Sequence, residues 1–158
     1  MAVSTDFTGR TIDQLIFQGV AASGDQLITT GWGNAGEICT GVQKVAQTWT
    51  VLFFTELGSI PLDPTRGSTF IQAVRSGRIR VDDDVTAEFN LAAERIRRIM
   101  DQDAVEAGDL PDDERLDEAT LVRFTLDLAM QYLAMTVNIQ TMAGVNREII
   151  LPVSISIR

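Results

Sequence analysis

Histidine is absent from this 158-residue chain, and cysteine and lysine each occur once, as Cys39 and Lys44. Without histidine the chain lacks the commonest general base, the Ser–His and Cys–His nucleophile pairs, and most zinc or iron ligand sets. A single cysteine excludes an internal disulfide and a cysteine-rich metal site. An enzyme would have to work with carboxylates alone, so we expect a non-enzymatic protein with no cofactor and no metal, made in a reducing cytoplasm.

Long apolar runs and positive charge are also scarce. No apolar run reaches the ~18 residues that span a bilayer, and the opening residues lack the charged-then-apolar order of a signal peptide. The formal net charge is −9, which opposes binding to phosphate backbones. Neither nucleic acid nor a membrane is expected as a partner. What the chain does have is 45% hydrophobic residues, enough for one folded domain.

An amphipathic helix is predicted to start near Asn34 and to end before Gly58. Asn34 and Glu37 have the spacing of a capping box, Gly58 fits a left-handed C-terminal cap, and Pro61 prevents continuation. One side of this helix is apolar, with Ile38, Val42, Val45, Trp49, Leu52 and Phe53 at helical spacing. The other side carries Gln43, Lys44, Gln47 and Thr48.

A rigid turn follows this helix. In Asp63-Pro64-Thr65-Arg66-Gly67 the positions of Asp, Pro and Gly favour a type I turn closed by a residue with positive φ. Ser68 can then cap a short helix that runs through Val74. The turn and the short helix together predict a compact connection into the next long helix.

The second long helix is predicted over residues 84–100, with aspartates at its start and Arg95, Arg97 and Arg98 near its end, as the helix dipole favours. The acidic segment that follows, residues 101–118, is predicted to be a solvated loop. A calcium loop is the sharper alternative, but the acids lack the regular spacing and mid-loop glycine that it needs.

From about residue 123 the apolar period changes from 3.6 to 2, which predicts strands over 123–128, 135–140 and 149–157 with a turn at 143–146. The fold class is therefore α+β, with helices followed by a small antiparallel sheet that ends in a β-hairpin over 133–158. Residues 34–158 are predicted to form a single domain, and residues 1–33 are an N-terminal segment of the same domain. A helix over 117–132 is the competing assignment. In the N-terminal segment, a short helix over 12–20 and a strand over 26–30 are open alternatives.

Two patterns invite an enzymatic interpretation. Glu37 and Glu56 flank the first helix, and a carboxylate pair is the minimum that a glycan hydrolase needs. The glycine-rich residues 31–36 precede a helix, but no Gly-Lys-Ser/Thr or dinucleotide pattern follows. A cap for Glu37, a surface position for Glu56 and a structural turn for the glycines are the simpler interpretations.

The last predicted strand is the other notable element, with Ile149, Leu151, Val153, Ile155 and Ile157 alternating along it. Such a strand is either covered inside its own sheet or offers an edge to a strand of another subunit. Only Pro152 would blunt that edge. The sequence leaves both interpretations open.

The block from Cys39 to Phe70 resembles the baseplate wedge and sheath-initiator family of contractile phage tails. The resemblance rests on Gln43, Lys44 and Gln47 on the helix, Thr55-Glu56-Leu57-Gly58 at its end, and Pro61, Asp63, Pro64 and Gly67 in the turn. The chain departs from the family at Gly58-Ser59-Ile60, where Gly-Glu-Arg is frequent. It also has no Glu-Pro-Arg triplet after the second helix.

The resemblance implies a structural protein of the virion, present in multiple copies around the tail axis of the baseplate. It implies docking on wedge and tube or hub proteins through Gln43, Lys44, Gln47, Glu56 and Arg66, next to a structural turn built by Gly58, Pro61, Asp63, Pro64 and Gly67. The tail sheath protein would add a strand along Ile149, Leu151, Val153, Ile155 and Ile157. A tail-completion or neck protein and a carboxylate-based glycan hydrolase are the alternatives.

Overall fold

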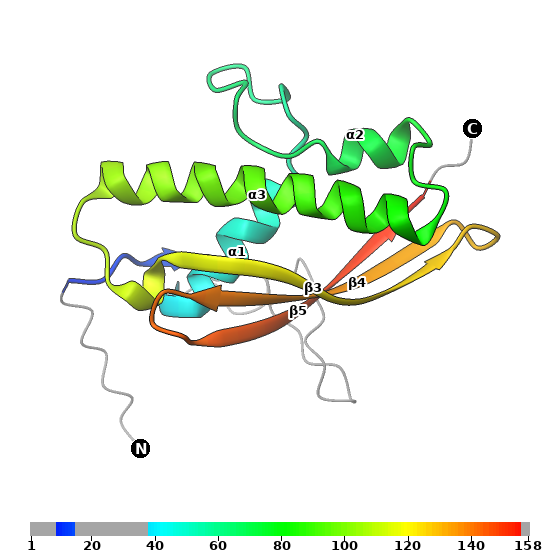
Figure 1. The fold of residues 1–158 in the computed structure, drawn as a ribbon. Coiled ribbons are helices and arrows are strands. Elements are labelled where there is room, and N and C mark those ends of the chain that lie inside the picture. The colour runs from blue at the N-terminus through cyan, green and yellow to red at the C-terminus, as the bar shows by residue number, and fades with distance from the viewer. Residues whose placement is uncertain (1–8, 15–37, 156–158) are drawn as a thin grey trace.

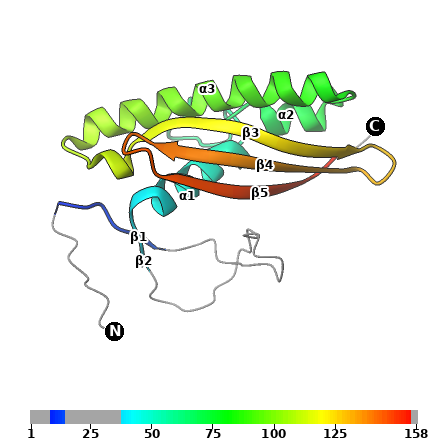
Figure 2. The same ribbon diagram turned by 60° about the horizontal axis from the view of Figure 1, so that its bottom comes forward.

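The computed structural model describes residues 9–14 and 38–155 of the chain. Its elements are β1 (Asp13–Gln14), β2 (Ile38–Cys39), α1 (Gly41–Phe54), α2 (Phe70–Arg75), α3 (Asp82–Ala107), a 3-10 helix (Asp112–Glu114), β3 (Leu116–Asp127), β4 (Tyr132–Thr141) and β5 (Asn146–Ser154). The last three strands form an antiparallel sheet in the order β3-β4-β5, and the helices cover one of its faces (Figures 1 and 2). The predicted α+β class and the terminal β4–β5 hairpin are confirmed.

The core lies between the helices and one face of the sheet. Every second residue of β4 and β5 is buried there: Leu133, Met135, Val137, Ile139, Ile149, Leu151 and Val153, followed by Ile155. The helices contribute an aromatic cluster in which Trp49 stacks on Phe53 at 4.9 Å between ring centroids, and Phe53 lies 4.6 Å from Phe70. Each such side chain stabilises the fold by about 1.5–3 kcal/mol through burial. The opposite face of the sheet is polar, as the 3.2 Å bond from Arg123 Nε to Thr136 Oγ1 illustrates.

The first helix starts later than predicted. Ile38 and Cys39 belong to β2, which pairs antiparallel with β1, so the helical assignment for Ile38 is wrong. Gly41 has a φ of 60°, and this left-handed conformation turns the chain from the strand into α1. From there the predicted apolar side is confirmed by four buried residues, Val45, Trp49, Leu52 and Phe53.

Gly58 does not cap this helix. α1 ends at Phe54, and Thr55 closes it by donating both its N–H and its hydroxyl to the Val51 carbonyl, at 2.9 and 2.7 Å. Gly58, with a φ of 84°, instead lies inside a β-turn that the Ser59 N–H closes on the Glu56 carbonyl at 3.0 Å. Thr55, three residues before the predicted cap Gly58, therefore bonds the Val51 carbonyl at the end of the helix.

α3 is longer than predicted because the acidic segment continues it. Residues 101–107 are helical and β3 begins at Leu116, so the predicted loop over 101–118 is wrong at both ends and is confined to the connection between these elements. Acids at helical spacing are held on the helix by partners, as in the ion pair between Arg97 and Asp101. The arginines predicted near the C-terminus therefore lie in the middle of α3, whose last turn has no basic residue. The predicted acidic start is confirmed, and the Asp84 carboxylate accepts the N–H of Val81 at 3.0 Å.

β3 begins seven residues before the strand predicted for its place, at Leu116 instead of Arg123. Register shifts at Asp117 and Val122 mark two β-bulges, each of which moves the apolar alternation by one residue. The inward residues are consequently spaced three, two, three and two apart: Leu116, Ala119, Leu121, Phe124 and Leu126. Because this spacing is not a strict alternation, the sequence pattern did not predict the first part of the strand. The alternative helix over 117–132 is wrong.

Some predictions fall outside the described residues. These are the strand over 26–30, the glycine-rich residues 31–36, the capping box of Asn34 and Glu37, and Ile157. Asp13 and Gln14 are described and form β1, so the start of the helix suggested over 12–20 is wrong.

Candidate functional site

The outer edge of β5 is a regular interaction surface on the described part of the chain. β5 lies at one end of the sheet, and within 9–14 and 38–155 no strand pairs with its outer side (Figure 2). Its pairing with β4 runs from Asn146 to Ser154 without a bulge. A regular edge of this length can accept an incoming strand through main-chain hydrogen bonds.

Alternate residues of β5 direct their backbone polar groups to opposite sides. Two hydrogen bonds fix the alternation: Thr141 N–H donates to the Val145 carbonyl at 3.0 Å, and Ile155 N–H donates to the Gln131 carbonyl at 2.8 Å. In an antiparallel ladder the residues that bond the neighbouring strand alternate with those that do not. The odd-numbered residues of β5 therefore bond β4, and the even-numbered residues direct their backbone groups to the open edge.

The residues predicted to bind the sheath are the odd-numbered ones. Ile149, Leu151, Val153 and Ile155 are buried in the core, and their backbone groups face β4. A partner strand at this edge would bond the residues between them instead: Asn146, Glu148, Ile150, Pro152 and Ser154. The predicted residues therefore pack the core, while the backbone N–H and C=O groups available to a partner strand belong to the even-numbered residues between them.

Pro152 is the sequence signal that distinguishes the two sets. Proline has no N–H, so within a strand it is tolerated where no ladder bond is needed. Pro152 occupies an edge-facing position opposite Ala134, so the ladder to β4 loses no bond. Because of Pro152 the open edge has one donor fewer, while Glu148 and Ile150 keep their N–H groups.

The predicted turn block between α1 and α2 forms a tightly held loop. The Thr55 carbonyl accepts the Ser68 N–H at 2.8 Å, and the Ser68 carbonyl accepts the Leu57 N–H at 3.0 Å. Gly67 has a φ of 101°, and a Cβ at this position would lie 2.4 Å from the Thr55 oxygen. Only glycine fits such a close approach, which confirms the predicted residue with positive φ after the turn.

Side chains bond the same turn from both sides. The Asp63 carboxylate accepts the N–H of Thr65 at 3.2 Å and its hydroxyl at 2.6 Å, and the hydroxyl bond lowers the pKa of Asp63. Arg66 forms a two-pronged ion pair with Asp103 of α3, at 2.8 and 2.7 Å. Arg95 of α3 donates to the Gly67 carbonyl at 3.1 Å. The turn is thus fixed to α3, and the charge of Arg66 is used inside the domain.

Two of the three polar residues predicted for docking on α1 contact the chain's own N-terminal part. Lys44 donates to the Thr11 hydroxyl, and buried Gln47 donates to the Gln14 carbonyl at 2.9 Å. Gln43 is half-buried beside them. In the same corner, burial and the Asp13 carboxylate raise the pKa of the Cys39 thiol. This side of α1 therefore holds β1 in place.

The carboxylates considered for catalysis are not brought together. Glu37 lies outside the described residues, and Glu56 forms an ion pair with Arg75 on the surface. The other conspicuous carboxylate, Glu114, is buried and accepts the N–H of Thr11 at 3.0 Å.

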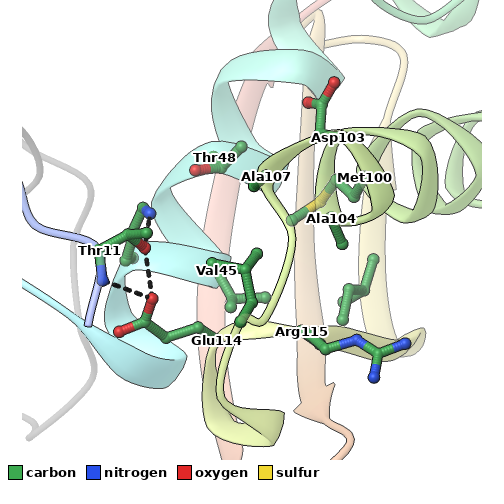
Figure 3. Close-up of a pocket in the computed structure, with 12 residues that line it drawn as sticks. Thr11, Val45, Thr48, Met100, Asp103, Ala104, Ala107, Glu114 and Arg115 are labelled. Carbon is green, nitrogen blue, oxygen red and sulfur yellow. Dashed lines mark hydrogen bonds between the residues drawn. The ribbon is translucent and has the colours of Figure 1, made fainter. Parts of the chain in front are cut away.

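Glu114 lies at one end of a small cleft of about 170 Å³ between α1, the end of α3 and the start of β3 (Figure 3). Apolar side chains such as Val45, Met100 and Leu116 line it. At its ends Glu114 bonds Thr11 and Asp103 bonds Arg66. Because Glu114 and Asp103 both form bonds within the domain, we interpret the cleft as a gap in the packing beside β1.

Within the described part of the chain, no group of histidine, cysteine and acidic residues could hold a metal ion, and no helix could span a membrane. No protein-family model, curated protein or solved structure matches the chain.

Proposed function

We propose that this chain is a non-enzymatic structural protein of a contractile phage tail baseplate. It docks on wedge and tube proteins and starts sheath assembly by offering the outer edge of its terminal β-hairpin to a strand of the sheath protein. The virion is its site of action. The observation that carries the proposal is the regular β5 edge, which no strand covers among the described residues.

Two further features support it. The turn block from Thr55 to Gly67, which carries the family resemblance, forms a loop anchored to α3 and gives the domain a rigid frame. The order of elements, helix, turn, helix and antiparallel sheet, is the order that the resemblance implies. Main-chain bonds of strand addition stabilise a complex by only about 1 kcal/mol each, so several per subunit repeated around a ring would hold the first sheath layer.

The decisive experiment removes an edge donor without touching the core. Ile150 directs its N–H to the open edge, so Ile150→Pro removes that donor and leaves the ladder to β4 intact. Ile150→Thr is the matched control, because it changes the side chain and keeps the N–H. Baseplates assembled with each variant and the sheath protein of the same phage are examined by electron microscopy for extended sheaths.

We expect Ile150→Pro to abolish sheath growth and Ile150→Thr to support it, with circular dichroism showing that both variants are folded. Normal sheaths on Ile150→Pro baseplates would refute strand addition at β5. Ser154→Pro, which removes another edge-facing N–H at an exposed position, repeats the test should Ile150→Pro fold poorly.

A further inference from the structure

The opposite edge of the sheet borders a groove. The groove has a volume of about 560 Å³ and lies between the first half of α3 and β3. Asp82, Thr86 and Asn90, spaced four apart on one face of α3, form one wall. The other wall is β3 from Glu118 to Leu126. α3 and β3 run in opposite directions, so Asp82 lies at the end of the groove away from Glu118 (Figure 1).

Within residues 9–14 and 38–155 no strand pairs with the outer side of β3, so its wall presents backbone groups to this groove. The odd-numbered residues of β4 bond β5, so the even-numbered residues of β4 bond β3, as the 3.0 Å bond from Met142 N–H to the Arg115 carbonyl shows. The β3 residues opposite them are therefore occupied. The remaining ones direct their backbone groups outward: Ala119, Leu121, Phe124 and Leu126. An extended polypeptide is the occupant whose own donors and acceptors match such a row.

The side chains of the groove add two further requirements. Leu121, Phe124 and Leu126 are half-buried along its floor, and Val122 at the bulge is 51% exposed, which favours apolar side chains on the side of the guest that faces them. Across from them, Thr86 and Asn90 are exposed and can bond the guest from the helix side.

The charged side chains at the two ends of the groove indicate which residues a bound segment would carry near its ends. Among the described residues, neither Asp82 nor Glu118 forms an ion pair, so each end of the groove carries a carboxylate without a cationic side-chain partner. Arg123 also borders the groove, but its side chain belongs to the polar sheet face, where it bonds Thr136. A guest with a basic residue near each end would complement this pattern.

We propose that the α3–β3 groove binds a second extended segment, of about eight residues, from another protein, with apolar residues in its middle and a lysine or arginine near each end. At about 3.3 Å per residue such a segment is about 26 Å long, the length of the β3 edge from Glu118 to Leu126. With a strand also added at β5, the sheet would continue from one partner through this domain into another. The groove is independent of β5, and its occupation is tested separately.

The probe is an eight-residue synthetic peptide, capped at both termini, of alternating threonine and valine with a lysine at each end. It is titrated into the full-length ¹⁵N-labelled protein, and amide hydrogen exchange is followed. We expect saturable binding that slows exchange at Ala119, Leu121, Phe124 and Leu126. A peptide with glutamate at both ends should bind about 3- to 30-fold more weakly, because two exposed ion pairs become two like-charge contacts.

The matched variants are Thr86→Trp, which fills the groove from an exposed position, and Ala87→Trp, which places the same side chain on α3 outside the groove wall. We expect Thr86→Trp to abolish peptide binding and Ala87→Trp to preserve it, with both proteins folded by circular dichroism. Three results would each overturn the proposal: no binding of the lysine peptide, protection at Glu148 and Ile150 instead of β3, or equal binding to the Thr86→Trp protein. A failure here leaves sheath growth, and with it the proposed function, unaffected.

Discussion

Replacing Gly67 by alanine tests whether the turn block owes its shape to a single missing side chain. Its φ of 101° costs an L-residue about 1–2 kcal/mol. The added Cβ would also lie 2.4 Å from the Thr55 oxygen and 3.0 Å from the Thr55 carbonyl carbon. Both are backbone atoms, so the loop must move. That movement disrupts the 2.8 Å bond from Ser68 N–H to Thr55, and loss of a buried bond costs about 1–3 kcal/mol.

The expected loss in the free energy of unfolding for Gly67→Ala is therefore about 2–5 kcal/mol, a large part of the 5–15 kcal/mol typical of a domain. Gly58→Ala is the matched control, because Gly58 also has a positive φ, 84°, but a Cβ there would meet nothing within 4 Å. It should cost only about 1–2 kcal/mol. Urea unfolding followed by tryptophan fluorescence measures both. If the two variants differ by less than about 0.5 kcal/mol, the steric argument for Gly67 is refuted.

The ion pair between Arg66 and Asp103 is about one-third exposed on each side, so a double-mutant cycle with Arg66→Ala and Asp103→Ala should give a coupling of about 0.5–1 kcal/mol that shrinks in 1 M salt; a coupling that salt leaves unchanged would contradict a screened ion pair. The Thr65 hydroxyl lowers the pKa of Asp63, so the stabilisation is present above the unfolded-state pKa and is lost as the pH falls through the folded-state pKa. Asp63→Asn should accordingly flatten the decline in unfolding free energy between neutral and acid pH, measured by urea titrations across that range, and an unchanged slope would count against the bond.

Much of the fold could be predicted because apolar spacing reports it directly where the backbone is regular. The strict alternation from Ile149 to Ile155 identified β5, and the helical spacing of Val45, Trp49 and Leu52 identified α1. The start of α1 was missed because Ile38 fits the spacing of a helix and equally the end of a strand. Nothing local to Ile38 shows that β1 pairs with it.

The remaining misses also have physical causes. At β3, two bulges displaced the alternation by one residue each, so a continuous strand looked like a short one. At the end of α3, acidic composition suggested a loop, whereas Arg97 pairs with Asp101 one turn further along the same helix and Arg66 of the turn block pairs with Asp103. A partner contributed by a distant residue is invisible in a window of sequence.

The residues predicted to bind at β5 differ from the edge-facing ones because side chains and backbone groups give different sequence signals. Hydrophobic alternation reports where side chains point, so it selects the odd-numbered residues of β5, which build the core. Backbone polar groups alternate with the same period of two, but in β5 only Pro152 marks in the residue type which set faces the edge. Apolar alternation therefore predicted that β5 is a strand and selected its core-facing residues, whereas the edge-facing backbone groups belong to the even-numbered residues.

This separation gives the two sets of β5 residues different mutational consequences. A change at Leu151, which is fully buried, removes core packing and costs about 2–5 kcal/mol as alanine, whatever the protein binds. A change at Ile150 or Glu148 leaves the core in place and alters only what the edge offers to a neighbour. Pro152 shows that the strand already accepts a missing edge donor without losing its ladder. An effect on assembly that follows the even-numbered residues, with stability unchanged, is the signature that strand addition at β5 would leave and that a purely structural strand would not.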